Sequence, residues 1–195
     1  MKSLTVSNFA NSFGVAEKTF SKSCRQIISD TNFQYHDING VKLESLLLRI
    51  LKRIDEDVQV IGAEERQEVW EKGWQENLDD FIDSDFDEVK LVPKFIRPNN
   101  PIRYNQNYIL PEQQEFELNF VKVFRQWFLE NYFSNVENIY EYGCGTGFNL
   151  VAAGKLFPEK KLYGSDFVQS SVDLVNAIGK AKNIPLQGDL FDMIK

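Results

Sequence analysis

The fold of this 195-residue chain is decided by the stretch IYEYGCGTGFN, residues 139–149. A short apolar run comes first, and three glycines then alternate with other residues. Glycine adopts positive φ without strain, and its missing side chain lets a ligand approach the backbone. The helical pattern that follows would direct unpaired N–H groups and a partial positive charge at such a ligand. The stretch therefore predicts a strand, a tight ligand-binding loop and a helix.

Two common nucleotide-binding loops do not match this spacing. A dinucleotide-binding loop has glycines at its first, third and sixth positions, but the sixth position counted from Gly143 is Phe148. A phosphate-binding Walker loop ends in Gly-Lys-Ser/Thr, whereas Gly147 precedes Phe148 here. The motif that remains is Glu-x-Gly-x-Gly-x-Gly, from Glu141 to Gly147.

Helices and strands alternate in the chain after the glycine loop. A helix is predicted over 148–157, and a second strand over 161–166. Ser170-x-x-Asp173 has the pattern of a capping box and predicts the start of another helix. A third strand is predicted over 184–187. The order strand–helix–strand–helix–strand predicts a parallel sheet with right-handed crossovers.

Three acids lie at or just after the ends of the three predicted strands: Glu141, Asp166 and Asp189. Ligands of open parallel sheets bind beyond the carboxyl ends of the strands. Asp166 follows the first glycine at the distance, roughly 20 residues, that suits a carboxylate accepting hydrogen bonds from ribose hydroxyls. Phe167 is placed to lie against a purine, and Asp189 with the Leu190 N–H to bind the adenine edge.

Taken together, the glycine loop and these acids resemble the first three motifs of class I S-adenosylmethionine-dependent methyltransferases. The resemblance covers about residues 112–195 and implies S-adenosyl-L-methionine as the cofactor. It implies that Glu141 anchors the loop and contacts the amino end of the cofactor, that Asp166 binds the ribose, and that Asp189 binds the adenine. The residues assigned to the cofactor are Glu141, Gly143, Cys144, Gly145, Gly147, Asp166, Phe167, Asp189 and Leu190.

The expected chemistry is transfer of a methyl group from a sulfonium to a nucleophilic acceptor. Most of the catalytic help in such a reaction is alignment, so the catalytic residues are not identified from the sequence. Cys144 is interpreted as a small loop residue, because a nucleophilic cysteine needs a base and the single histidine, His36, is distant in the sequence. His36 is interpreted as a surface or cap residue.

A separate, helical domain is predicted over residues 1–92. Its last helix carries Trp70 and Trp74, which are interpreted as core or interface residues. The segment 93–111 is rich in Pro, Asn and Arg and is predicted to be a linker. A sharper hypothesis makes it a lid, with Arg103, Tyr104 and Tyr108 facing the cofactor or substrate. The fold class predicted is thus α/β: a helical N-terminal domain, then an incomplete Rossmann-like sheet over 112–195.

The composition of the chain limits the kinds of partner that are expected. The net charge is −7, so no broad basic surface for nucleic acid is expected, and a small-molecule substrate is favoured. The acidic run 76–88 does not match a calcium-binding loop, which needs Gly at its sixth position and Glu at its twelfth. No metal site is therefore predicted. With two cysteines, no signal-peptide pattern and no long apolar run, a cytoplasmic location without membrane insertion is expected.

The predicted sheet is shorter than that of the family it resembles. Members have seven strands, whereas the residues after 136 provide for three. The chain is therefore interpreted as the N-terminal part of a longer methyltransferase. An unpaired apolar edge along strand 138–142 predicts a homo-oligomer that covers it. Two alternatives stay open: an NAD(P)-dependent oxidoreductase, and a non-catalytic cofactor-binding or interaction module.

Overall fold

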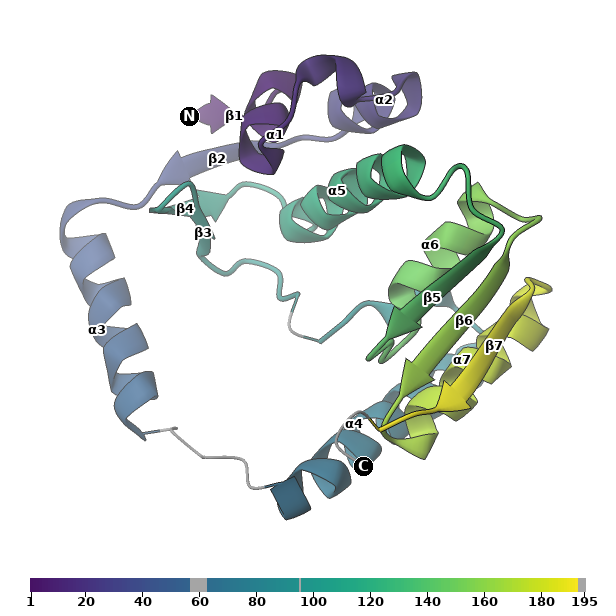
Figure 1. Ribbon diagram of the computed structural model, residues 1–195. Coiled ribbons are helices and arrows are strands. Elements are labelled where there is room, and N and C mark those ends of the chain that lie inside the picture. Colours follow the sequence, from purple (N-terminus) through teal and green to yellow (C-terminus); the bar gives the residue numbers. More distant parts are fainter. Residues whose placement is uncertain (57–62, 95, 193–195) are drawn as a thin grey trace. The chain divides into compact units, whose positions relative to one another are not determined.

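The computed structural model describes residues 1–56, 63–94 and 96–192, which belong to two compact units (Figure 1). Unit 1 comprises Met1–Val60 and Phe95–Asn131, and unit 2 comprises Ile61–Lys94 and Tyr132–Lys195. This division differs from the predicted domains in two long helices and in the short helix Glu88–Leu91, which belongs to unit 2. The helix that carries Trp70 and Trp74 belongs with the parallel sheet, and the helix that precedes the sheet belongs with the N-terminal residues.

Unit 1 contains an antiparallel sheet that the sequence reading missed. Its strands are β1 (Lys2–Ser3), β2 (Gln34–Asp37), β3 (Ile102–Tyr104) and β4 (Asn107–Pro111), in the order β1-β2-β4-β3. The N-terminal part is therefore mixed rather than helical. The last ten residues of the predicted linker, 102–111, form the β3–β4 hairpin, which turns at Asn105 and Gln106 with φ of 45° and 67°. Two successive positive φ values are typical of a tight hairpin turn.

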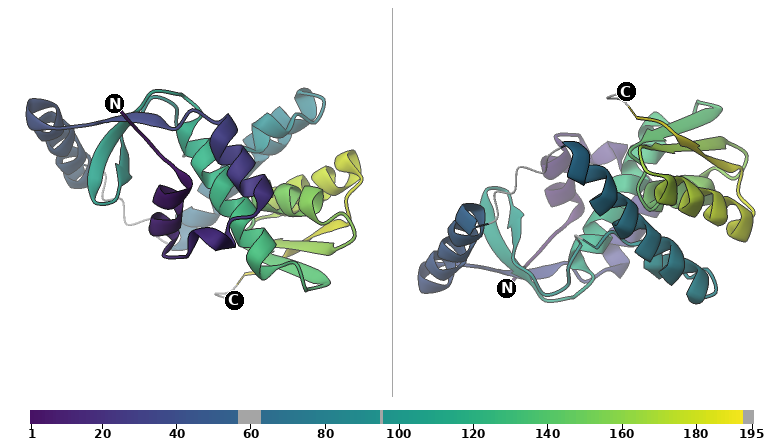
Figure 2. Two further views of the ribbon diagram at one scale, coloured as in Figure 1. Left: turned by 90° about the horizontal axis from the view of Figure 1, so that it is seen from above. Right: turned by 90° about the horizontal axis from the view of Figure 1, so that it is seen from below.

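Helices α1 (Val6–Phe13), α2 (Lys22–Asp30) and α5 (Phe116–Tyr132) share an aromatic core with this sheet. Unit 1 also contains the short helix η1 (Glu17–Thr19) and the helix α3 (Gly40–Glu56), which contributes no residue to that core. Phe9 lies 5.0 Å from Phe33 and 4.9 Å from Phe120, measured between ring centroids. Figure 2 shows the N-terminal helices beside α5. The buried core side chains are Leu4, Phe9, Ala10, Phe20, Cys24, Ile28, Phe33, Tyr35, Ile109, Phe116, Val123 and Trp127.

Unit 2 contains the predicted parallel sheet. The strands β5 (Asn138–Tyr142), β6 (Lys161–Asp166) and β7 (Leu186–Leu190) lie in the order β5-β6-β7. The crossover helices α6 (Phe148–Leu156) and α7 (Gln169–Lys182) cover one face of the sheet. The predicted order strand–helix–strand–helix–strand is thus confirmed. The third strand begins later than predicted, so that Asp189 and Leu190 lie inside it.

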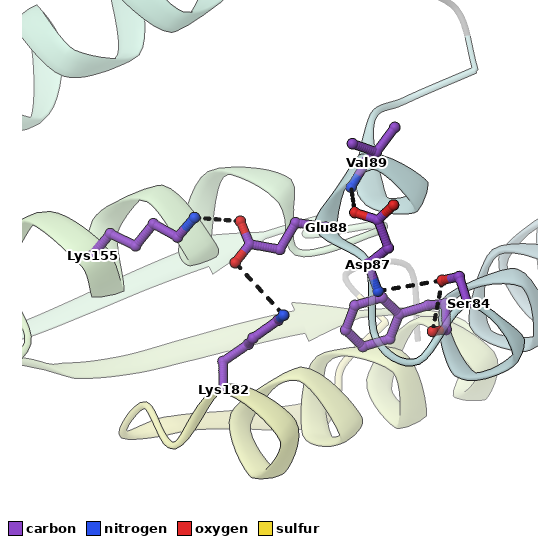
Figure 3. Close-up of polar contacts among 7 residues, drawn as sticks. Ser84, Asp87, Glu88, Val89, Lys155 and Lys182 are labelled. Atoms are coloured by element: carbon purple, nitrogen blue, oxygen red, sulfur yellow. Dashed lines mark hydrogen bonds and ion pairs between the residues drawn. The ribbon is translucent and has the colours of Figure 1, made fainter.

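A second helical layer completes unit 2. Helix α4 (Ala63–Asp83) and the short helix η2 (Glu88–Leu91) pack on α6 and α7. The shared core consists of Leu78, Phe81, Leu91, Val151, Leu174 and Ile178. Two acids of the run 76–88 make contacts within this layer. Glu88 pairs with Lys155 of α6 and lies 3.8 Å from Lys182 of α7, while Asp87 accepts a hydrogen bond from the Val89 N–H at 3.0 Å (Figure 3).

Candidate functional site

The loop after β5 has the left-handed backbone that its glycines predict. Gly143, Gly145 and Gly147 have φ of 68°, 52° and 68°. The N–H groups of Gly143 and Cys144 both donate to the Ser165 carbonyl oxygen, at 2.7 and 3.1 Å. The loop therefore folds back on β6, the neighbouring strand. A side chain at any of these glycines would be strained, because L-residues rarely adopt positive φ.

Packing gives two of the three glycines a second reason to lack a side chain. A Cβ at Gly145 would lie 3.0 Å from Cζ2 of Trp74, and one at Gly147 would lie 3.2 Å from Val175 and Ile178. A Cβ at Gly143 would meet no atom within 4 Å. Packing thus requires two of the glycines, whereas the backbone of Gly143 faces open space that a ligand can reach.

Asp166 lies directly beside this loop. Its side chain is 4% exposed, its Oδ2 accepts a hydrogen bond from the Gly145 N–H at 2.9 Å, and its Oδ1 accepts one from the Phe167 N–H at 2.8 Å. Each carboxylate oxygen has two acceptor positions, so one on each oxygen is occupied by the backbone. The carboxylate thus stabilises the loop, a role that the sequence reading did not assign to it.

Glu141 and Cys144 complete the loop. Glu141 Oε1 accepts a hydrogen bond from the Asn149 side chain of α6 at 2.7 Å. Burial raises the pKa of the Cys144 thiol to about 12, so the thiol is protonated at neutral pH. Its Sγ lies 3.7 Å from Ser171 Oγ, which in turn donates to the Gly145 carbonyl at 2.7 Å. This chemistry suits a packed loop residue rather than a nucleophile.

The remaining predicted residues lie at the same edge of the sheet. Asp189 of β7 is the register partner of Ser165, and Leu190 is that of Asp166. Asp189 is exposed and accepts a hydrogen bond from Gln187 at 3.1 Å, and Leu190 is 58% exposed. Phe167 is half-buried. The loop, Asp166 and Asp189 thus lie at the same edge of the sheet, on three adjacent chain segments. Asp189 is aligned with Ser165, so its side chain points to the opposite face of the sheet from that of Asp166.

Helix α4 contributes two residues that the sequence reading did not place here. The indole of Trp74 covers Gly145, and its ring stacks on Trp70 with centroids 5.6 Å apart. Glu71 accepts hydrogen bonds from the Gln169 and Ser170 N–H groups at 2.9 and 2.8 Å. The predicted capping box is therefore wrong. The N-cap of α7 is Val168, which makes no side-chain cap bond, and Glu71 takes that role from a distant helix.

The three residues of the lid hypothesis belong to unit 1. Tyr104 and Ser12 hydroxyl oxygens are 3.0 Å apart, and Arg103 is the register partner of Tyr108 across the hairpin. The lid stays a prediction. His36 lies on β2, with Nε2 at 2.6 Å from Glu112 Oε1.

The described residues contain neither a metal-binding cluster nor a helix that could span a membrane. Among the described residues, no group of three or more His, Cys, Asp or Glu side chains could hold a metal ion. None of the described helices combines the length and apolar content that crossing a membrane requires. No protein-family model, curated protein or solved structure matches the chain.

Proposed function

We propose that unit 2 is a Rossmann-like domain that binds S-adenosyl-L-methionine at the glycine loop, and that the protein is a methyltransferase for a small-molecule acceptor. The observation that carries the proposal is the 2.9 Å hydrogen bond from the Gly145 N–H to Asp166. This bond joins the acid at the end of β6 to the glycine loop at the end of the neighbouring strand, β5. That is where ligands of open parallel sheets bind.

Charge favours this cofactor over a dinucleotide. The loop has Asp166 buried against it, Glu141 at its start and Asp189 on the third strand. A dinucleotide would bring two negative phosphates to the loop, where Glu141 would repel them. S-adenosylmethionine has a sulfonium and an ammonium group against one carboxylate, so its net charge is opposite to that of the site.

The residues present offer open space and acceptor oxygens for the cofactor. Open space beside Gly143 leaves its backbone accessible, and each Asp166 oxygen retains an acceptor position for a ribose hydroxyl. Asp189 is exposed at the adjacent strand end, where it can accept from the adenine amino group. When bound, the cofactor supplies an electrophilic methyl group on its sulfonium. The role of the chain is then to hold the cofactor and acceptor in line, which can contribute roughly 7–11 kcal/mol.

Isothermal calorimetry on the whole chain tests the proposal. S-adenosylmethionine and S-adenosylhomocysteine are expected to bind, and NADH is not. Gly143→Ala is expected to weaken binding at least tenfold, because the methyl group would enter the space beside the loop. Gly14→Ala is the matched control, since Gly14 has φ of 69°, a Cβ there would also meet no atom within 4 Å, and it lies in unit 1.

Three outcomes would contradict the proposal: no heat with S-adenosylmethionine, preferential binding of NADH, or equal effects of the two glycine variants. Asp166→Ala is a second variant, and its thermal unfolding must be measured alongside, because it also frees the Gly145 N–H. If the whole chain transfers a methyl group to an acceptor, the alternative that it is a non-catalytic module is excluded.

A further inference from the structure

Unit 1 contains a cavity that the proposed function does not use. It has a volume of about 770 Å³ and lies between helix α3 and the segment that leads into the β3–β4 hairpin. This volume is within the range of roughly 300–1,000 Å³ in which small-molecule sites fall. The cavity is formed by residues of unit 1 alone.

The cavity is lined by cations. Arg49, Lys52 and Arg53 come from α3, and Arg97 comes from the opposite segment. The three helical residues are spaced i, i+3 and i+4, so they share one face of α3. No Asp or Glu is among the described lining residues, although the whole chain has 29 acids and 22 Lys and Arg. The lining is thus strongly basic in a chain that is acidic as a whole.

Apart from Asn100, the rest of the wall is apolar or aromatic. Leu46, Ile50 and Pro101 contribute apolar surface, and Tyr108 contributes a ring with a hydroxyl. A guanidinium presents donors in a planar fork that matches phosphate oxygens. Three arginines and a lysine beside an apolar wall therefore fit a ligand with a strongly anionic end and a compact organic part.

We propose that this cavity binds a small phosphate-bearing anion of the pyrophosphate or nucleoside diphosphate type. The ligand is a small molecule rather than a nucleic acid, because the cations lie in one cavity and the chain as a whole is acidic, with a net charge of −7. An extended nucleic acid would require a basic surface beyond the cavity. The proposal does not depend on the glycine loop, and its failure would leave the proposed function untouched.

Calorimetry with inorganic pyrophosphate and with ADP tests this site. Both are expected to bind at low ionic strength with Kd below about 1 mM, and binding is expected to weaken as salt rises. Arg49→Ala/Lys52→Ala is expected to raise Kd at least tenfold. Lys42→Ala is the matched control, because Lys42 is an exposed residue of the same helix that does not line the cavity. It is expected to change Kd less than twofold.

The variants are expected to fold, since exposed helix positions tolerate alanine well, and circular dichroism checks this. Because Lys52, Arg53 and Arg97 have other interactions within the chain, a third variant, Arg49→Ala alone, should still weaken binding measurably. Absence of heat with both ligands would overturn the proposal. Equal losses in Lys42→Ala and in the double variant, or tight binding of single-stranded RNA that pyrophosphate does not displace, would also overturn it.

Discussion

Trp74 of α4 lies against Gly145 of the glycine loop, so closely that a Cβ at position 145 would come within 3.0 Å of the indole Cζ2. The contact joins the second helical layer of unit 2 to the loop at the end of β5. It follows that the loop conformation depends on a helix more than 60 residues earlier in the chain.

The first prediction concerns this contact. Gly145→Ala is expected to destabilise the protein by about 2–5 kcal/mol, from the left-handed backbone and from overpacking against Trp74. Gly143→Ala is expected to cost only about 1–2 kcal/mol, because it adds backbone strain without a clash. Urea unfolding followed by circular dichroism measures both. Adding Trp74→Leu to Gly145→Ala should recover part of the loss, and additive effects would show that the two residues are not coupled.

The second prediction concerns Glu71, which binds the first N–H groups of α7. Glu71→Ala is expected to lower the free energy of unfolding by about 1–3 kcal/mol, since charged hydrogen bonds at a helix N-terminus are lost. Glu76→Ala is the control on the same helix. Glu76 pairs with Lys94 at 3.3 Å with both side chains more than half exposed, and such pairs contribute below about 1 kcal/mol. Equal losses in the two variants would contradict the capping role.

The third prediction is a pH dependence. Burial raises the pKa of Cys24 and Cys144 from 9.0 to about 12. At a pH between these two pKa values, the thiols of the unfolded chain lose their protons while those of the folded chain keep them. Deprotonation therefore stabilises the unfolded state relative to the folded state. The free energy of unfolding should therefore fall as pH rises above about 9. Cys24→Ala/Cys144→Ala should show a shallower fall, and thiol reagents should label the native protein slowly and the unfolded protein fast. Rapid native labelling at pH 8 would contradict the buried, protonated state.

The fourth prediction concerns the edge of the parallel sheet. Within the described residues β5 pairs only with β6, and Tyr140 and Tyr142 are 56% and 62% exposed. We expect a second copy to pair along β5, because an exposed strand edge is a template for another strand. Sedimentation velocity should show association that Tyr140→Lys reduces and Tyr132→Lys does not, since Tyr132 is equally exposed but outside the strand. A purely monomeric wild-type chain would contradict it.

Much of unit 2 could be predicted because its signals are local in the sequence. The glycines specify positive φ, and the apolar runs at β5 and β6 specify buried strands. Asp166, the last residue of β6, follows Gly143 at the expected distance and does lie beside the loop. The helices between the strands were placed to within a few residues, because Pro158 and Gly147 limit α6.

The rest depended on contacts between distant segments. Trp74 and Glu71 act on residues about 70 and 98 positions later in the chain, and nothing near them in the sequence indicates their partners. The strands of unit 1 are two to five residues long, too short for an alternating pattern to be recognised. The capping box of α7 was wrong for the same reason, since a remote carboxylate satisfies that helix N-terminus.

The interleaving of the two units has a consequence for biosynthesis. Helix α4 leaves the ribosome before α7, its main packing partner, has been translated, because α7 begins at Gln169. The apolar side of α4, which includes Leu78 and Phe81, therefore stays without its partner helix in the nascent chain while α5, the last helix of unit 1, is translated. Slow translation over this interval should make the chain depend on chaperones, and a shortened chain that starts at residue 112 should expose the surface that α4 normally covers.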